Sequence, residues 1–297
     1  MGGRARVSVD DGSTPILDRL VEETSRLESL WSRFIEDSEV SRLNACDGAP
    51  AFVSAETAQL IDAARRAHRA TQGFFDPLML RELAAAGYAQ TFDLVAAGRP
   101  PLPAHEPSGI EVRPSIQDAD VDTTAGLVQL PAGAAFDPGG IGKGLATDRL
   151  AALAVDSGAD WAIVDLGGDV RVRGDQLPFG EFRIDIAHPD GSLLGAVGIA
   201  DGAAATSGTG KRRWRRADGI QQHHLLDPRT GEPAVSDLAA VTVLASEAWW
   251  AEAVATAAVV AGRDRGVALL EELDVPAIAV TTLGHTIECG PIEEFLL

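Results

Sequence analysis

The stretch WAIVDLGGDVRV, residues 161–172, sets the expectation for the fold. Two strand-like runs, residues 161–166 and 170–172, are separated by a Gly-Gly turn instead of a helix. Strand-like runs continue at residues 182–186, 196–199, 239–244 and 277–281, and several of these neighbours also lack an intervening helix. We therefore expect an α+β fold with mainly antiparallel sheets and packed helices, not a doubly wound parallel sheet.

Apolar residues at helical spacing predict helices at residues 16–34, 54–70, 144–155, 246–261 and 265–273. Ser54 is a candidate N-cap, but Thr57 stands where a capping box has glutamate. Four prolines between Gly98 and Pro114 prevent regular structure there. We expect one domain over residues 1–297, either as one body or as two lobes with a proline-rich connection near residues 98–114.

The charge balance excludes several partners. With 25 Lys and Arg against 44 Asp and Glu, the net charge of −19 repels nucleic acid and anionic membranes. Cys46 and Cys289 are far apart and lack ligand spacing, so neither a disulfide framework nor structural zinc is expected. No apolar run is long enough for a membrane span. The polar start predicts a cytoplasmic protein for the chain as written, and an exported one if a leader is missing.

The segment DPGGIGKG, residues 137–144, runs directly into a helical pattern. Glycines allow a ligand to approach the backbone, and a helix N-terminus offers free N–H groups to a phosphate. A Walker A loop is excluded, because Asp137 and Gly144 stand where that motif needs Gly and Ser or Thr. A tight turn with close packing is the alternative interpretation.

Two further segments carry polar groups suited to chemistry. His223 and His224 precede a DPRTG turn, and either histidine has a purely structural alternative. Glu252 and Thr256 stand four residues apart, on one face of an alanine-rich helix, and their oxygens suit a hard cation such as Mg²⁺. The alternative for Glu252 is an exposed glutamate on a half-buried helix.

Taken in order, seven segments resemble those of the ApbE-like FAD:protein FMN transferases. The segments are FIEDSEVSRLN (34–44), GFFDP (73–77), DPGGIGKG (137–144), LGGD (166–169), ATSG (205–208), HLLDPRTG (224–231) and AEAVAT (251–256). The resemblance implies a two-lobed fold and magnesium-dependent transfer of the FMN moiety of FAD to a Thr or Ser hydroxyl of an acceptor flavoprotein, with release of AMP. An FAD pyrophosphatase and a non-catalytic FAD-binding or storage protein are the alternatives.

The resemblance also assigns residues to roles. It implies His224 as the base toward the acceptor hydroxyl, and Mg²⁺ held by the Gly140 carbonyl with Glu252 and Thr256. The family usually has aspartate at position 252, so the longer glutamate places the choice of metal in question. The residues that the resemblance implies for FAD binding are Met1, Phe34, Phe74, Phe75, Asp76, Asp137 and Lys143.

Overall fold

The computed structural model describes residues 3–10, 14–97, 113–174, 180–215 and 219–297. The described chain forms two compact units. The first unit comprises residues 28–140 and 209–235, and the second comprises residues 3–27, 141–208 and 236–297. Helix α1 (Thr14–Trp31) begins in the second unit and ends in the first.

The second unit is built on a seven-stranded sheet of described residues, in the order β1-β5-β6-β9-β12-β13-β14, with antiparallel pairing throughout. β5 and β6 are the hairpin expected at residues 161–172, with Leu166 opposite Asp169 across the Gly-Gly turn. The strands are β1 (Ala5–Val9), β5 (Trp161–Leu166), β6 (Asp169–Gly174), β9 (Gly202–Gly208), β12 (Leu238–Ala245), β13 (Ala277–Thr281) and β14 (Thr286–Cys289).

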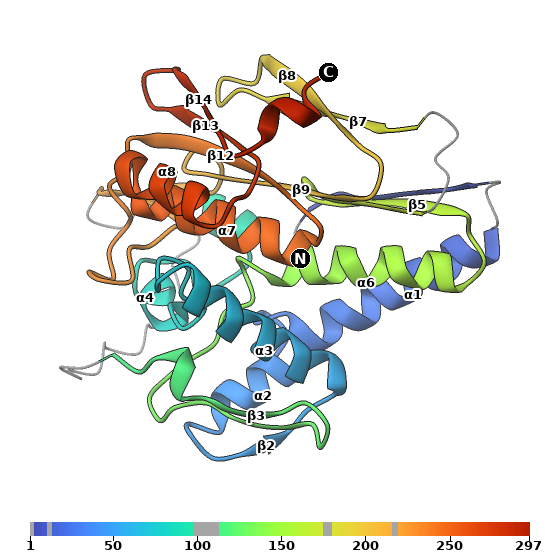
Figure 1. The fold of residues 1–297 in the computed structure, drawn as a ribbon. Helices are drawn as coiled ribbons and strands as arrows, with labels where there is room; N and C mark the ends of the chain where they lie inside the picture. The colour runs from blue at the N-terminus through green and yellow to red at the C-terminus, as the bar shows by residue number, and fades with distance from the viewer. Residues whose placement is uncertain (1–2, 11–13, 98–112, 175–179, 216–218) are drawn as a thin grey trace. The chain divides into compact units, whose positions relative to one another are not determined.

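Helices and a second hairpin cover the two faces of this sheet (Figure 1). On one face lie α6 (Gly142–Asp156) and α7 (Ala248–Ala261), and on the other lies the hairpin β7 (Phe182–Ala187) and β8 (Leu193–Ile199). α7 is apolar nearly all round and almost wholly buried, as expected for a helix inside a core. The unit is completed by α8 (Arg263–Glu272) and the 3₁₀ helix η3 (Ile292–Phe295).

The first unit contains short helices and two small antiparallel sheets, β2-β4-β3 and β10-β11. Its core includes Met79, Leu83, Tyr88 and Trp214. Its elements are α2 (Glu39–Ala45), β2 (Ala51–Phe52), α3 (Ala55–Ala70), α4 (Leu80–Ala85), α5 (Phe92–Ala96), η2 (Ile116–Asp118), β3 (Asp120–Asp122), β4 (Leu127–Gln129), β10 (Arg213–Arg215) and β11 (Gln221–His223).

The capping box that the sequence leaves incomplete at α3 is completed by another helix. Ser54 accepts a hydrogen bond from the Thr57 N–H at 3.3 Å, as predicted for an N-cap. The glutamate of the box is supplied by Glu39 of α2, whose carboxylate oxygens each lie 3.0 Å from the Ser54 backbone nitrogen. α2 and α3 are therefore joined through one shared cap.

The α+β prediction with mainly antiparallel sheets is confirmed. None of the described helices combines the length and apolar content that a bilayer crossing requires. The proline-rich connection near residues 98–114 lies mostly outside the described residues and stays a prediction.

Candidate functional site

The first turn of α6 is formed by the glycine-rich segment and receives a carboxylate. The backbone N–H of Gly144 donates to Glu252 Oε2 at 2.8 Å. The N-cap residue Ile141 has no side-chain cap of its own, so Glu252 satisfies a donor that α6 would otherwise leave open. A negative charge at a helix N-terminus is also favoured by the helix dipole.

Lys143 lies between two carboxylates. Its Nζ is 2.5 Å from Glu252 Oε1 and also pairs with Asp169 at the start of β6. Burial alone would lower the pKa of Lys143, but the charges of Asp169 and Glu252 raise it above its ordinary value. Lys143 is therefore a fixed positive charge at neutral pH and not a proton acceptor.

Glu252 is buried, with 5% of its surface exposed, so the alternative of an exposed helix glutamate is wrong. Burial, followed by the negative charge of Asp169, raises the pKa of Glu252 to about 7, although Lys143 and the Gly144 N–H oppose the rise. Two carboxylates share one ammonium group at this position. Lys143, Asp169 and Glu252 therefore form one buried charged cluster in the second unit.

Thr256 lies one turn further along α7 and faces β9. Its hydroxyl is 3.2 Å from the Ser207 hydroxyl, so the ATSG segment and the AEAVAT segment meet here. Within the described ranges, no three His, Cys, Asp or Glu side chains gather into a metal-binding group. The predicted magnesium ligands are of another kind, since they combine one carboxylate with a hydroxyl and a backbone carbonyl.

α6 and α7 pack too closely for a side chain at position 144. A Cβ on Gly144 would lie 2.5 Å from the Ala248 carbonyl oxygen and 2.6 Å from Trp249 Cα. The close-packing interpretation of the glycine-rich segment is therefore correct for Gly144. The same contact brings the Gly144 N–H within reach of Glu252.

Asp148 of α6 and Arg171 of β6 form a further ion pair in the second unit. Asp148 accepts hydrogen bonds from the N–H groups of Ala248 and Trp249 at 2.8 and 3.0 Å, and lies 3.5 Å from Arg171. α7 has no side-chain cap of its own, so Asp148 caps it from α6. Burial raises the pKa of Asp148 to about 6, against the lowering effect of these N–H groups and Arg171.

In the first unit, an arginine joins two of the residues predicted for FAD binding. Arg33 Nε lies 3.4 Å from Asp137 Oδ1, and its guanidinium carbon lies 4.3 Å from the centre of the Phe34 ring. Phe34 is 38% exposed. Phe34 and Asp137, which are far apart in the sequence, are thus neighbours through Arg33.

Backbone contacts tie the remaining first-unit segments to Asp137. The Asp137 N–H donates to the Pro77 carbonyl at 2.7 Å, which joins the GFFDP segment to the glycine-rich segment. Asn44, the last residue of the FIEDSEVSRLN segment, bonds both the N–H and the carbonyl of Phe136, at 2.7 and 2.9 Å. The segments at 34–44 and 73–77 therefore meet the start of the glycine-rich segment, at Asp137, in the first unit.

The GFFDP side chains differ in exposure. Phe75 is buried in the unit, whereas Phe74 is half-buried and has the Arg229 guanidinium 5.4 Å from its ring centre. Burial raises the pKa of Asp76, whose carboxylate caps the Leu78 N–H at 2.9 Å. The FAD-binding roles of these three residues stay predictions.

The two histidines have different environments. His223 Nε2 lies 3.2 Å from the Ala234 carbonyl, and its Nδ1 accepts from the Leu225 N–H at 3.3 Å. These contacts define a neutral ring, and burial lowers the pKa of His223. The structural alternative therefore applies to His223, while His224 is half-buried in the loop after β11 and keeps its predicted role as a proposal.

The predicted site residues are divided between the units. Lys143, Glu252 and Thr256 belong to the second unit, whereas Gly140 and His224 belong to the first. The other described residues predicted for FAD binding also belong to the first unit: Phe34, Phe74, Phe75, Asp76 and Asp137. Met1 lies outside the described residues.

Sequence reasoning gave no role to Arg33, Asp148 or Arg171, and it included Asp169 only as part of the LGGD segment. The alternation Asp169, Val170, Arg171, Val172 was a usable signal, because it places two charges on one face of a strand whose other face is apolar.

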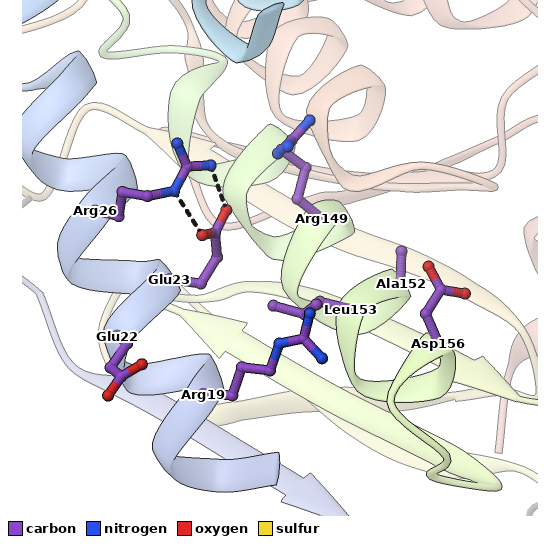
Figure 2. A pocket seen from close by; sticks show the side chains of 8 residues that line it. All are labelled: Arg19, Glu22, Glu23, Arg26, Arg149, Ala152, Leu153 and Asp156. Carbon is purple, nitrogen blue, oxygen red and sulfur yellow. Dashed lines mark hydrogen bonds and ion pairs between the residues drawn. The ribbon is translucent and has the colours of Figure 1, made fainter. Parts of the chain in front are cut away.

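A separate hollow of about 490 Å³ lies between α1 and α6 in the second unit (Figure 2). Arg26 and Glu23 form a two-bonded ion pair at its edge, at 2.7 and 2.8 Å. None of the predicted site residues lines it.

Comparison with known proteins covers nearly the whole chain. The model of the ApbE family matches residues 1–279. An FAD:protein FMN transferase of Treponema pallidum is 31% identical over 82% of this chain and 71% of its own length, and one of Klebsiella pneumoniae is 28% identical over 95% of this chain and 87% of its own.

Solved structures agree with the fold. The crystal structure of the ApbE protein of Thermotoga maritima has a TM-score of 0.83 at 28% identity, covering 99% of this chain and 96% of that one. The flavin transferase ApbE of Vibrio cholerae has a TM-score of 0.80 at 22% identity, covering 100% and 96%, and supports the fold alone. From the serial motifs, the family match and the shared fold, we conclude that this chain belongs to the ApbE family.

Proposed function

We propose that the chain transfers the FMN moiety of FAD to a threonine or serine hydroxyl of an acceptor flavoprotein, with Mg²⁺ as cofactor and AMP as the second product. The observation that carries the proposal is the family match over residues 1–279, with relatives named FAD:protein FMN transferase. His224 and Thr256 stand where the resemblance expects a histidine and a threonine, and Glu252 stands where it expects an aspartate.

In the proposed reaction, the acceptor oxygen forms a bond to the phosphorus on the FMN side of the FAD pyrophosphate. The bond from that phosphorus to the bridging oxygen breaks, and AMP leaves with the bridging oxygen. His224 takes the proton of the acceptor hydroxyl, a step that typically contributes about 10²–10⁴-fold. Phe34, Phe74 and Asp137 bind and orient FAD.

We propose oxygen donors of this chain as the ligands of the magnesium ion, since Mg²⁺ prefers oxygen ligands. Glu252 and Thr256 would hold it with the Gly140 carbonyl, and when bound it would neutralise charge on the phosphates. Both Glu252 oxygens already accept a hydrogen bond, but a carboxylate oxygen has a second lone pair for a metal.

The test is to incubate the purified chain with FAD, Mg²⁺ and an acceptor domain carrying a threonine target. AMP is measured by chromatography and protein-bound flavin by in-gel fluorescence. We expect both products to appear together. His224→Ala should lose about 10²–10⁴-fold in transfer while its FAD affinity stays within about twofold, and His285→Ala is the matched control at an exposed histidine.

Other outcomes reject the proposal in distinct ways. AMP without labelled acceptor would indicate an FAD pyrophosphatase. Bound, intact FAD without AMP would indicate an FAD-binding or storage protein. Equal loss of FAD binding and transfer in His224→Ala would assign His224 to structure.

A further inference from the structure

Arg33 is a buried cation whose contacts all lie in the first unit. Its side chain is 7% exposed. It follows the end of α1, two residues after Trp31. A buried guanidinium of this kind requires both charge compensation and hydrogen-bond partners.

Two of its partners are polar. Asp137 supplies the compensating charge, at 3.4 Å from Arg33 Nε. Arg33 also donates to the Tyr88 carbonyl at 3.0 Å. The same Asp137 oxygen accepts the Gly139 N–H at 2.9 Å, so the Asp137 carboxylate links Arg33 to the backbone of the glycine-rich segment.

The other two partners are aromatic rings. The guanidinium carbon lies 4.3 Å from the ring centre of Phe34 and 4.7 Å from that of Tyr88. Tyr88 is fixed in turn by Trp214 and Phe92, at 5.4 and 6.0 Å between ring centres. Tyr88 is buried, whereas Phe34 is 38% exposed.

This arrangement has a consequence for ligand binding at Phe34. Because Arg33 occupies one face of the Phe34 ring, a planar ligand ring has only the opposite face on which to stack. The guanidinium holds that ring and the Asp137 carboxylate in a fixed relation. Lysine cannot reproduce this, because it lacks the planar fork and the stacking surface.

We infer that Arg33 is a positioning residue of the FAD site, which orients Phe34 as a stacking platform for a planar ring of FAD and holds Asp137 beside it. The inference rests on the proposed function, since it takes FAD as the ligand of Phe34 and Asp137. Arg33 acts through these two residues, so its removal should change how FAD is held and not only how stable the chain is.

The experiment compares Arg33→Gln and Arg33→Lys with the parent in titrations of FAD at fixed Mg²⁺. Arg183→Gln is the matched control, because Arg183 forms an exposed ion pair with Asp185 at 2.8 Å. Two quantities are measured: the dissociation constant and the quenching of flavin fluorescence at saturation, which reports ring stacking. We expect Arg33→Gln to raise the dissociation constant about tenfold and to reduce the quenching. Arg33→Lys should raise the dissociation constant less than Arg33→Gln does, and Arg183→Gln should change it by less than twofold.

A double-mutant cycle guards against a purely structural effect. If Arg33 and Asp137 act as one unit, Arg33→Lys combined with Asp137→Asn should weaken FAD binding by less than the product of the single effects. This cycle also replaces Arg33→Gln if that variant fails to fold by circular dichroism.

Three outcomes decide the matter. Unchanged affinity and quenching in both Arg33 variants would overturn the inference and leave the proposed function intact. If the Arg33 variants unfold more easily but bind FAD like the parent, Arg33 has only a structural role, and the inference is overturned as well. A parent chain that binds no FAD would instead overturn the proposed function itself.

Discussion

Lys143 Nζ lies 2.5 Å from Glu252 Oε1, and this contact joins the first turn of α6 to α7. The glycine-rich segment and the alanine-rich helix, which are far apart in the sequence, therefore share one ion pair. Asp169 adds a second carboxylate to the same ammonium group. The arrangement makes Lys143 a structural as well as an electrostatic part of the proposed site.

Replacing Lys143 by Met should destabilise the chain strongly. The change leaves Asp169 and Glu252 buried without their cation, and breaking a buried ion pair typically costs about 3–5 kcal/mol. The free energy of unfolding in urea is the measurement. Lys211→Met, at an exposed lysine, is the control and should change it by less than about 0.5 kcal/mol. A loss below about 1 kcal/mol for Lys143→Met would contradict the buried pairing.

Gly144→Ala should separate α6 from α7. The added Cβ would lie 2.5 Å from the Ala248 carbonyl, and backbone cannot yield as a flexible side chain can. Overpacking of this kind costs about 1–3 kcal/mol, and the hydrogen bond from Gly144 to Glu252 would be strained too. Thermal unfolding should show a lower midpoint. The same substitution at Gly195, where nothing lies within 4 Å, should leave the midpoint nearly unchanged, and equal behaviour of the two variants would count against the close contact.

Asp148 should make stability depend on pH in a defined window. Burial raises its pKa from 3.8 to about 6, so the folded chain holds this proton more tightly than the unfolded chain. The contribution of protonated Asp148 to the free energy of unfolding is fully present below about pH 4 and is lost as the pH rises through about 6.

Asp148→Asn removes the titration. The difference in unfolding free energy between parent and variant should change by up to about 3 kcal/mol between pH 4 and pH 7, because one pKa unit corresponds to about 1.4 kcal/mol. Urea unfolding at several pH values measures it, with Asp264→Asn as the exposed control. A difference independent of pH would show that Asp148 has no raised pKa.

The length of the Glu252 side chain should affect how the activity of the chain depends on the metal ion. Glu252→Ala should need at least about tenfold more Mg²⁺ for FAD turnover than the parent. Glu252→Asp keeps a carboxylate, so its Mg²⁺ affinity should match or exceed that of the parent. Calorimetric titration with Mg²⁺, Mn²⁺ and Ca²⁺ gives a readout independent of activity. Glu288→Ala is the exposed control. Identical metal titrations for all Glu252 variants would place the metal elsewhere.

The sequence by itself predicted the α+β class and many of the longer helices and strands, but it left out β9 and β14 of the seven-stranded sheet. Strands at residues 161–166 and 277–281 were predicted with the bounds that the structure has, because mainly apolar runs bounded by Gly, Pro and polar residues are local signals. Helix ends were less well determined. The helix expected from residue 246 starts at Ala248, since its cap is Asp148 of another helix and not a neighbouring residue.

Only the tertiary structure decided the partners of the charged residues. Periodicity shows which face of a helix carries Glu252, but burial of that face depends on how α6, α7 and β6 pack. The same holds for Arg33, which looks like a surface arginine in sequence and becomes a buried link between Phe34 and Asp137. A charged side chain is buried where the fold places an opposite charge next to it. The two partners are far apart in the sequence, so only the folded chain brings them into contact.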